Sequence, residues 1–292
     1  MRAILLLAAL LPAAAADKPV VLVVTADASN YLLTAGGTIA GMADRGATVY
    51  LIRVTNDDKD SYDLPPEETA LRTRMESEQA AKMLGVREVI SMGYRASELH
   101  DASFTGIRDR LMFYIRHYKP AIVFIPNPYT EHDRVLDRYY TGSAAEDAWR
   151  AAALENYLPA AMDVGLKPHL TPELYYYAEP FDPRRREPES TETFVPQPKT
   201  VDISETIDKK IRAAQALKTI NYSMAKRLHD RLTATQRKLR LLEPFDETAV
   251  NRLVDLNVRG LAKIAAEGTP YKAAEEFRHA GVEFRIPRKY RR

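Results

Sequence analysis

The chain has 292 residues, of which 46% are hydrophobic, so it can bury a full core as one large domain, with or without a helical extension. Its 42 basic and 40 acidic residues leave a net charge of +2, and we therefore expect no nucleic-acid partner. The absence of cysteine excludes disulfides, thiolate metal sites and cysteine nucleophiles.

The first 16 residues have the order of a secretory signal peptide. Arg2 precedes an apolar run at 4–11, and small alanines at 13–16 predict cleavage after Ala16. The run is shorter than the roughly 20 apolar residues that cross a bilayer, and no later stretch approaches that length. We expect an exported protein, periplasmic or extracellular, without a stable transmembrane segment; an uncleaved anchor is the alternative.

Short apolar runs then alternate with helical segments, which predicts a parallel sheet covered by helices. The predicted strands are 20–26, 48–55, 87–93 and 121–127, and the predicted helices between them are 34–45, 66–84 and 103–117. Gly46 and Gly85 stand where helix C-caps are expected. The fold class is therefore α/β, with a Rossmann-like, mostly parallel sheet whose ligands bind beyond the carboxyl ends of the strands.

The second half is less regular. It predicts a helix at 141–158, a strand at 173–180, an exposed loop at 180–198 and a helix from Glu205 that Ser204 caps. Residues 224–280 are charged and are predicted to be helical. Three parts follow: a signal peptide (1–16), an α/β domain (17–222) and a C-terminal helical extension with a basic tail (223–292).

One motif points to a family. The first predicted strand ends in TADASNY (25–31) and leads into AGGTIAG (35–41), where Gly36 and Gly37 would permit a tight turn and close backbone approach. The motif is not GxGxxG, so it does not indicate a dinucleotide site. It resembles the first turn of the LmbE/PIG-L family, in which the strand ends in AHPDDE and the helix carries AGGTIA. Later matches are GYRASEL (93–99), IPNP (125–128) and VDISETIDKKIRAAQA (201–216), so the resemblance covers roughly residues 19–220.

The resemblance implies a zinc-dependent deacetylase of N-acetylglucosamine-type substrates, yet the site residues differ. The family's first zinc-binding His falls on Asp27, its general-base Asp on Ser29 and its second zinc-binding Asp on Asn30. The later HPDH motif, whose last His is the third ligand, falls on residues 135–138 and so on Arg138. A further family His falls on Leu217.

These replacements argue against the family's chemistry. A serine hydroxyl is a very weak base, an asparagine amide is a poor zinc ligand, and a guanidinium repels a divalent cation. We therefore expect no bound cofactor, and we predict that Arg138 forms a bidentate ion pair with Asp27, which places a fixed cation where the metal would be. The plain alternative is that both are separate, solvated residues.

The predicted ligand-binding cleft comprises Asp27, Ser29, Asn30, Gly36, Gly37, Asp137 and Arg138. The function that we expect is a zinc-less pseudoenzyme of the family that binds an N-acetylated sugar or glycan, or acts through a protein partner. One alternative is an active deacetylase with zinc in a rearranged site of Asp27, His132 and Asp137. Another is unrelated chemistry in the same cleft.

A tyrosine run at 175–177 could stack on sugar rings. Its strand-like sequence instead favours one buried ring with exposed neighbours.

Overall fold

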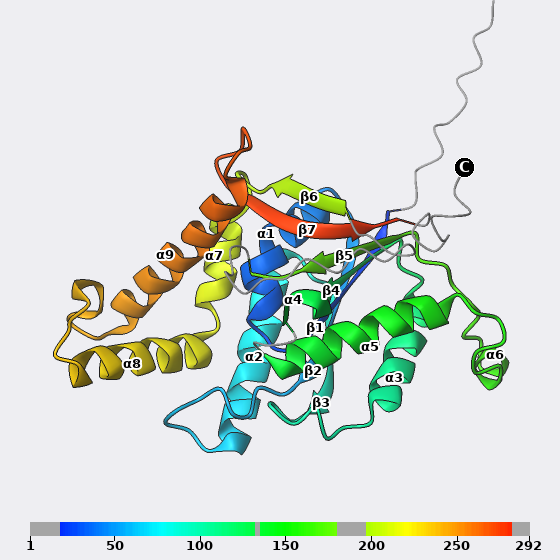
Figure 1. The fold of residues 1–292 in the computed structure, drawn as a ribbon, viewed down its shortest axis with the longest axis horizontal. Coiled ribbons are helices and arrows are strands. Elements are labelled where there is room, and N and C mark those ends of the chain that lie inside the picture. The colour runs from blue at the N-terminus through cyan, green and yellow to red at the C-terminus, as the bar shows by residue number, and fades with distance from the viewer. Residues whose placement is uncertain (1–17, 132–134, 180–196, 282–292) are drawn as a thin grey trace, which may run out of the picture.

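The structure is a computed structural model, and it describes residues 18–131, 135–179 and 197–281. Its described strands form one sheet in the order β3-β2-β1-β4-β5-β7-β6 (Figure 1). The strands are β1 (Val20–Thr25), β2 (Thr48–Thr55), β3 (Glu88–Tyr94), β4 (Ile122–Pro126), β5 (Glu173–Tyr177), β6 (Gln197–Asp202) and β7 (Ala274–Ala280). β1 to β5 are parallel, and β7 pairs antiparallel with both β5 and β6. The predicted α/β class with a mostly parallel sheet is confirmed.

Helices cover both faces of the sheet. They are α1 (Asn30–Asp44), α2 (Pro66–Leu84), α3 (Phe104–Tyr118), α4 (Pro128–Glu131), α5 (Leu136–Ala152), α6 (Ala160–Asp163), α7 (Ile207–Gln215), α8 (Lys218–Ala234) and α9 (Glu247–Ala266), with a 3-10 turn at Arg240–Leu242. No helix in the described ranges is long and apolar enough to cross a membrane.

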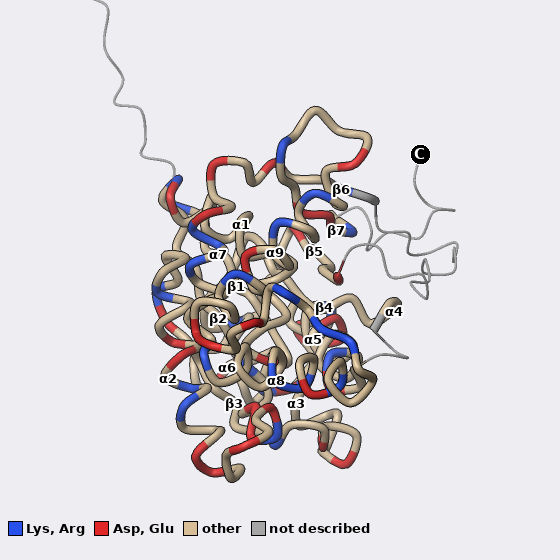
Figure 2. The backbone as a smooth tube through the Cα atoms, turned by 90° about the vertical axis from the view of Figure 1, so that its left-hand side faces the viewer, with Lys and Arg blue, Asp and Glu red and all other residues tan. Residues whose placement is uncertain are grey.

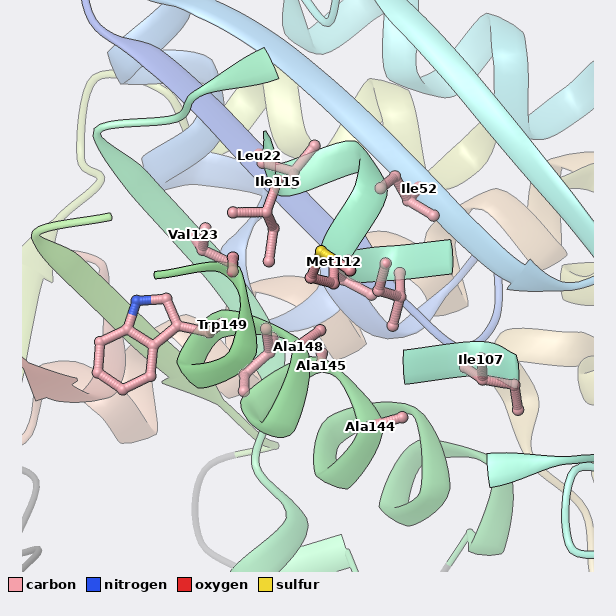
Figure 3. Packing of buried hydrophobic residues seen from close by; sticks show 14 of the residues in the cluster. Leu22, Ile52, Ile107, Met112, Ile115, Val123, Ala144, Ala145, Ala148 and Trp149 are labelled. Atoms are coloured by element: carbon pink, nitrogen blue, oxygen red, sulfur yellow. The ribbon is translucent and has the colours of Figure 1, made fainter. Parts of the chain in front are cut away.

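Alternate residues of each strand build two cores, one on each side of the sheet. Leu22 of β1 faces α3 and α5, where it joins a cluster with Met112 and Trp149 (Figure 3). Val23, the next residue, faces the opposite layer, which α1, α2 and α7 supply. Burial on both faces explains why the sequences of these strands are nearly continuous apolar runs.

The C-terminal region does not consist of helices alone. Residues 274–280 form β7, which lies between β5 and β6, so the prediction of helix throughout 224–280 is wrong there. This strand was not predicted because its sequence, AEEFRHA, is rich in charged residues. Glu275 of β7 is only 3% exposed. Its carboxylate accepts hydrogen bonds from Lys210 Nζ (2.8 Å) and from the amides of Gly37 and Thr38 (both 2.8 Å), and these bonds offset the cost of burying the charge. The proposed domain boundary at 222 falls inside α8.

Several predicted limits also change. α1 begins at residue 30 instead of 34, and α5 spans 136–152 instead of 141–158. Ser204 is not a helix cap, because its hydroxyl donates to Asp202 while α7 begins at Ile207. Gly85 does end α2 in the left-handed conformation, at φ 87°, as predicted. Residues 180–196 of the predicted loop lie outside the described residues, and residues 197–198 belong to β6. The predicted signal peptide and residues 282–292 of the C-terminal region also lie outside the described residues.

Charges of both signs are interspersed along the chain. In the view of Figure 2, blue and red segments alternate along α2 and the neighbouring loops, without a continuous stretch of one sign. This distribution agrees with the balanced composition. It provides no support for a nucleic-acid surface on that side.

Candidate functional site

Asp27 organises the turn between β1 and α1. Its Oδ1 accepts hydrogen bonds from the amide of Ser29 (2.9 Å), the hydroxyl of Ser29 (2.8 Å) and the amide of Asn30 (2.8 Å). Those amides begin α1, and a carboxylate is stabilised at a helix N-terminus by unpaired N–H groups and the helix dipole. The residue therefore stands at the carboxyl end of a central strand, where open α/β sheets bind their ligands.

The other oxygen of Asp27 meets Arg138. Arg138 Nε donates to Asp27 Oδ2 at 2.9 Å, and its Nη1 donates to Glu179 Oε1 at 3.2 Å. The Arg138 and Asp27 side chains are only 10% and 15% exposed. The predicted ion pair is confirmed, but it is not bidentate: the guanidinium bridges two carboxylates instead of gripping one. Arg138 is held from the first turn of α5, and Glu179 follows β5.

The electrostatics of Asp27 follow from these partners. Burial would raise the pKa of its carboxyl group, but the Arg138 charge and the hydrogen bonds from Arg138, Ser29 and Asn30 outweigh burial and lower that pKa. Asp27 is thus held as an anion. Ser29, at the position of the family's general base, donates its own proton to that anion and cannot accept one from water.

Asn30 is fully buried, at 0% exposure. Neither its amide nitrogen nor its amide oxygen has a hydrogen-bond partner among the residues that the structure describes. Such an orphaned side chain is unusual, since buried polar groups are nearly always paired. Both polar atoms of the Asn30 side chain are therefore buried at the start of α1 without a described partner.

The donor set does not fit zinc. Both oxygens of Asp27 are already engaged, Asn30 offers a neutral amide, and Arg138 brings a positive charge to the position of the family's third ligand. Within the ranges 18–131, 135–179 and 197–281, no group of three or more His, Asp or Glu side chains could hold a metal ion. His132, the residue on which the rearranged metal site depends, lies outside those ranges, so that alternative stays a prediction.

Three residues of the predicted cleft make contacts within the fold. Gly36 and Gly37 lie inside α1, where an added Cβ would be 3.3 Å from Lys210 and 2.8 Å from Ile203, respectively. Their close backbone approach is to α7 and the segment before it, and they form no turn. Asp137 accepts hydrogen bonds from the amides of Ser97 (2.5 Å) and Leu99 (3.3 Å), which anchors the loop after β3.

The loop after β2 supplies two acidic residues that the sequence analysis missed. Asp57 is fully buried and accepts hydrogen bonds from Ala28 N (3.1 Å), Thr55 Oγ1 (3.1 Å) and Arg53 Nη1 (3.3 Å); burial raises its pKa to about 8. Burial, followed by the charge of Asp27, raises the pKa of Asp60 to about 6. The signal was present in TNDDKD (55–60), directly at the carboxyl end of a strand beside β1.

The tyrosine run of β5 is not available to a ligand. Tyr175, Tyr176 and Tyr177 are 3%, 1% and 0% exposed, so the expectation of exposed neighbours is wrong. β5 lies between β4 and β7 and is covered on both faces, which buries every ring. Tyr62, in the loop that carries Asp60, is by contrast 64% exposed.

Known proteins share this fold. The family profile described as PIG-L, GlcNAc-PI de-N-acetylase, matches residues 22–148. A diacetylchitobiose deacetylase from Thermococcus kodakarensis is 26% identical over 184 residues, which are 62% of this chain and 62% of that protein's own length.

Two solved structures extend the likeness over most of the chain. The N,N'-diacetylchitobiose deacetylase from Pyrococcus horikoshii, complexed with its inhibitor MPG, has a TM-score of 0.69 at 21% identity and covers 92% of this chain and 87% of that one. GalB, the 4-carboxy-2-hydroxymuconate hydratase of Pseudomonas putida KT2440, has a TM-score of 0.59 at 19% identity and covers 91% and 96%. The second shows that the fold also carries a reaction other than deacetylation. The profile match over residues 22–148, the related sequence and the shared fold together show that the chain is similar to the deacetylase-like LmbE/PIG-L family.

Proposed function

We propose that this protein is a zinc-less member of the family that binds an N-acetylated sugar or glycan fragment without hydrolysing it. The observation that carries the proposal is the ion pair between Arg138 and Asp27, with an Nε–Oδ2 distance of 2.9 Å. A permanent cation at the position of a metal ligand both repels zinc and neutralises the carboxylate that would attract it.

Hydrolysis of an amide by the family's chemistry needs an activated water and a base that removes its proton. At the position of the base, Ser29 Oγ donates to Asp27 at 2.8 Å. The pKa of Asp60 is raised to about 6, but no metal-binding group among the described residues would polarise a water beside it. Loss of turnover with retention of a polar site is the simplest consequence.

Ligand binding remains chemically reasonable in such a site. Arg138 supplies guanidinium donors, whereas Glu179 and Asp60 supply carboxylate acceptors, and together they match the hydroxyl and amide groups of a sugar. The related protein from Thermococcus kodakarensis is a deacetylase of diacetylchitobiose, which supports an N-acetylated sugar as the class of ligand to test first.

The first experiment combines metal analysis of the purified protein with an assay for acetate release from N,N'-diacetylchitobiose. We expect substoichiometric zinc, no acetate release, and calorimetric binding of diacetylchitobiose that is unchanged by a chelator. Its deacetylated counterpart, chitobiose, is the matched ligand control and should bind more weakly. Stoichiometric zinc with chelator-sensitive acetate release would contradict the proposal.

A variant tests the positions themselves. The triple substitution Asp27→His, Asn30→Asp and Arg138→His restores the family's three ligand types, and the contact between residues 27 and 138 shows that two of these side chains already meet. We expect this variant to retain zinc where the natural sequence does not. If instead His132→Ala removes zinc from the natural protein, the rearranged metal site is correct.

The proposal includes export. It rests on the signal-like order of the first 16 residues, and N-terminal sequencing of protein recovered from the periplasm or medium tests it. A chain that begins at Asp17 or close to it is expected; an intact Met1 in the cytoplasm would contradict export.

A further inference from the structure

A cavity lies between α8 and the loop that joins β2 to α2. Its volume is about 740 Å³, and it is lined by Tyr62, Met224, Arg227, Leu228, Asp230 and Arg231. In Figure 1 that loop projects beneath α8, away from the helices that cover the centre of the sheet. Most of the lining comes from α8, which lies beyond the stretch matched by the family profile (22–148).

Two arginines without an ion-pair partner among the described residues line the cavity. Arg227 and Arg231 stand one helical turn apart, and neither has a carboxylate within 4.0 Å in the part of the chain that the structure describes. The nearby carboxylate of Asp230 is occupied by Lys226, at 2.8 Å. An exposed arginine of α2, Arg72, does have such a partner, since it pairs with Glu68 at 2.6 Å.

The remaining walls are apolar and aromatic. Tyr62 is 64% exposed and Met224 is 37% exposed, so both can contact a ligand in the cavity. The guanidinium carbon of Arg227 lies 5.5 Å from the centre of the Tyr62 ring, so the ring and the cation form one wall. The Tyr62 ring can pack against the apolar face of a sugar, and the neighbouring guanidinium can bind an anionic group that the sugar carries.

Asp60 links the cavity and the Arg138 site electrostatically. Asp60 and Tyr62 belong to the same loop, and the charges of both Arg227 and Arg138 act on the Asp60 carboxyl group. The positive charge of Arg227 therefore acts on the same carboxyl group as the charges of Arg138 and Asp27. A ligand seated at Arg138 could extend along the loop into this cavity.

We propose that the cavity between α8 and the β2–α2 loop binds the anionic group of a sugar ligand, a carboxylate or a phosphate, through Arg227 and Arg231. This inference rests on the proposed function, because it takes the N-acetylated ring of the same ligand to lie at Arg138. Tyr62 packs against the sugar ring that bears the charge. Binding of a neutral glycan extension is the competing outcome of the test.

The test compares three probes by calorimetry at low salt: neutral N,N'-diacetylchitobiose, N-acetylmuramic acid with its carboxylate, and N-acetylglucosamine 6-phosphate. Because charge-assisted hydrogen bonds are stronger than neutral ones, we expect the anionic probe that fits to bind about tenfold more tightly than the neutral probe. Preference for one anion or for both supports the proposal and identifies which group the cavity accepts.

Arg227→Gln and Arg231→Gln should each abolish most of this preference while leaving the neutral probe unaffected. Arg252→Gln is the matched control, because it removes the same charge from an exposed residue of α9 that does not line the cavity. All three sites are exposed, so the variants should fold, which far-ultraviolet circular dichroism verifies.

The proposal is overturned if the anionic probes bind no more tightly than the neutral one, or if Arg252→Gln weakens them as much as Arg227→Gln does. That result would leave the zinc-less sugar site untouched, since the neutral probe and the metal content test it separately. Conversely, zinc with turnover would overturn the proposed function without removing a measured preference for anionic sugars.

Discussion

Replacing Arg138 with methionine is the most informative perturbation of the site. The change keeps the length of the apolar stem but removes the cation between Asp27 and Glu179. Loss of one partner from a buried ion pair costs about 3–5 kcal/mol. Asp27 keeps three donors from the α1 turn, and the Glu179 side chain is 25% exposed, so we expect destabilisation of about 2–4 kcal/mol here.

The assay is urea unfolding at several pH values, with Arg95→Met as a matched control. Arg95 also donates Nε to an aspartate at 2.9 Å, but its side chain is 55% exposed, so its removal should destabilise the protein less than removal of Arg138 does. In the natural protein the pKa of Asp27 is lowered, so its ionisation stabilises the folded state above the unfolded pKa and this contribution disappears as pH falls through the folded pKa. Without Arg138, burial raises the pKa of Asp27.

The deficit of Arg138→Met should therefore be largest near neutral pH and shrink as the pH approaches about 4. In a double-mutant cycle with Asp27→Asn, the coupling energy should be about 1–3 kcal/mol. A deficit no larger than that of Arg95→Met, with no dependence on pH, would refute the account of a fixed cation held between two carboxylates.

Three further changes probe the surroundings of the site. Gly37→Ala places a Cβ 2.8 Å from atoms of Ile203 and should cost about 1–3 kcal/mol in thermal unfolding, whereas Gly260→Ala, with open space around it, should stabilise α9 by up to about 1 kcal/mol; equal effects would contradict the close packing. Asp60→Asn should stabilise the protein by about 1–2 kcal/mol at neutral pH, because a folded pKa raised to about 6 penalises ionisation, and the gain should vanish below pH ~4; a pH-independent change would argue otherwise. Lys210→Met leaves the Glu275 carboxylate buried without its cation and should lower the free energy of unfolding by about 3–5 kcal/mol, measured by chemical denaturation. A decrease below ~1 kcal/mol would contradict a stabilising role of this ion pair.

The sequence contained most of the fold because its central strands are buried on both faces. Runs such as VVLVVT (20–25) and AIVFIPN (121–127) need no partner to be recognised as strands. β7 was missed because its charged sequence, AEEFRHA, conceals the alternation, and the partner that permits burial of Glu275 lies 65 residues away at Lys210. Pairing across that distance cannot be read from local composition.

The sequence likewise predicted some residues of the candidate site and not others. The pair of Asp27 and Arg138 was predicted because the family's motifs fix which positions face each other, and the two residues are separated by 111 positions in the chain. Gly36 and Gly37 were expected to permit a tight turn but lie inside α1, since a short motif does not distinguish a turn from the close packing of a helix. Asp60 and Arg227 were missed because α8 reaches the β2–α2 loop only in the folded protein.

The central claim is that a fixed cation stands where the family's metal would be, and zinc titration of the metal-free protein by calorimetry at neutral pH tests it most directly. The ion pair of Arg138 with Asp27 predicts no saturable zinc binding by the natural sequence. It also predicts saturable binding by the variant that carries Asp27→His, Asn30→Asp and Arg138→His. Stoichiometric, tight zinc binding by the natural protein, accompanied by release of acetate from N,N'-diacetylchitobiose, would contradict the claim.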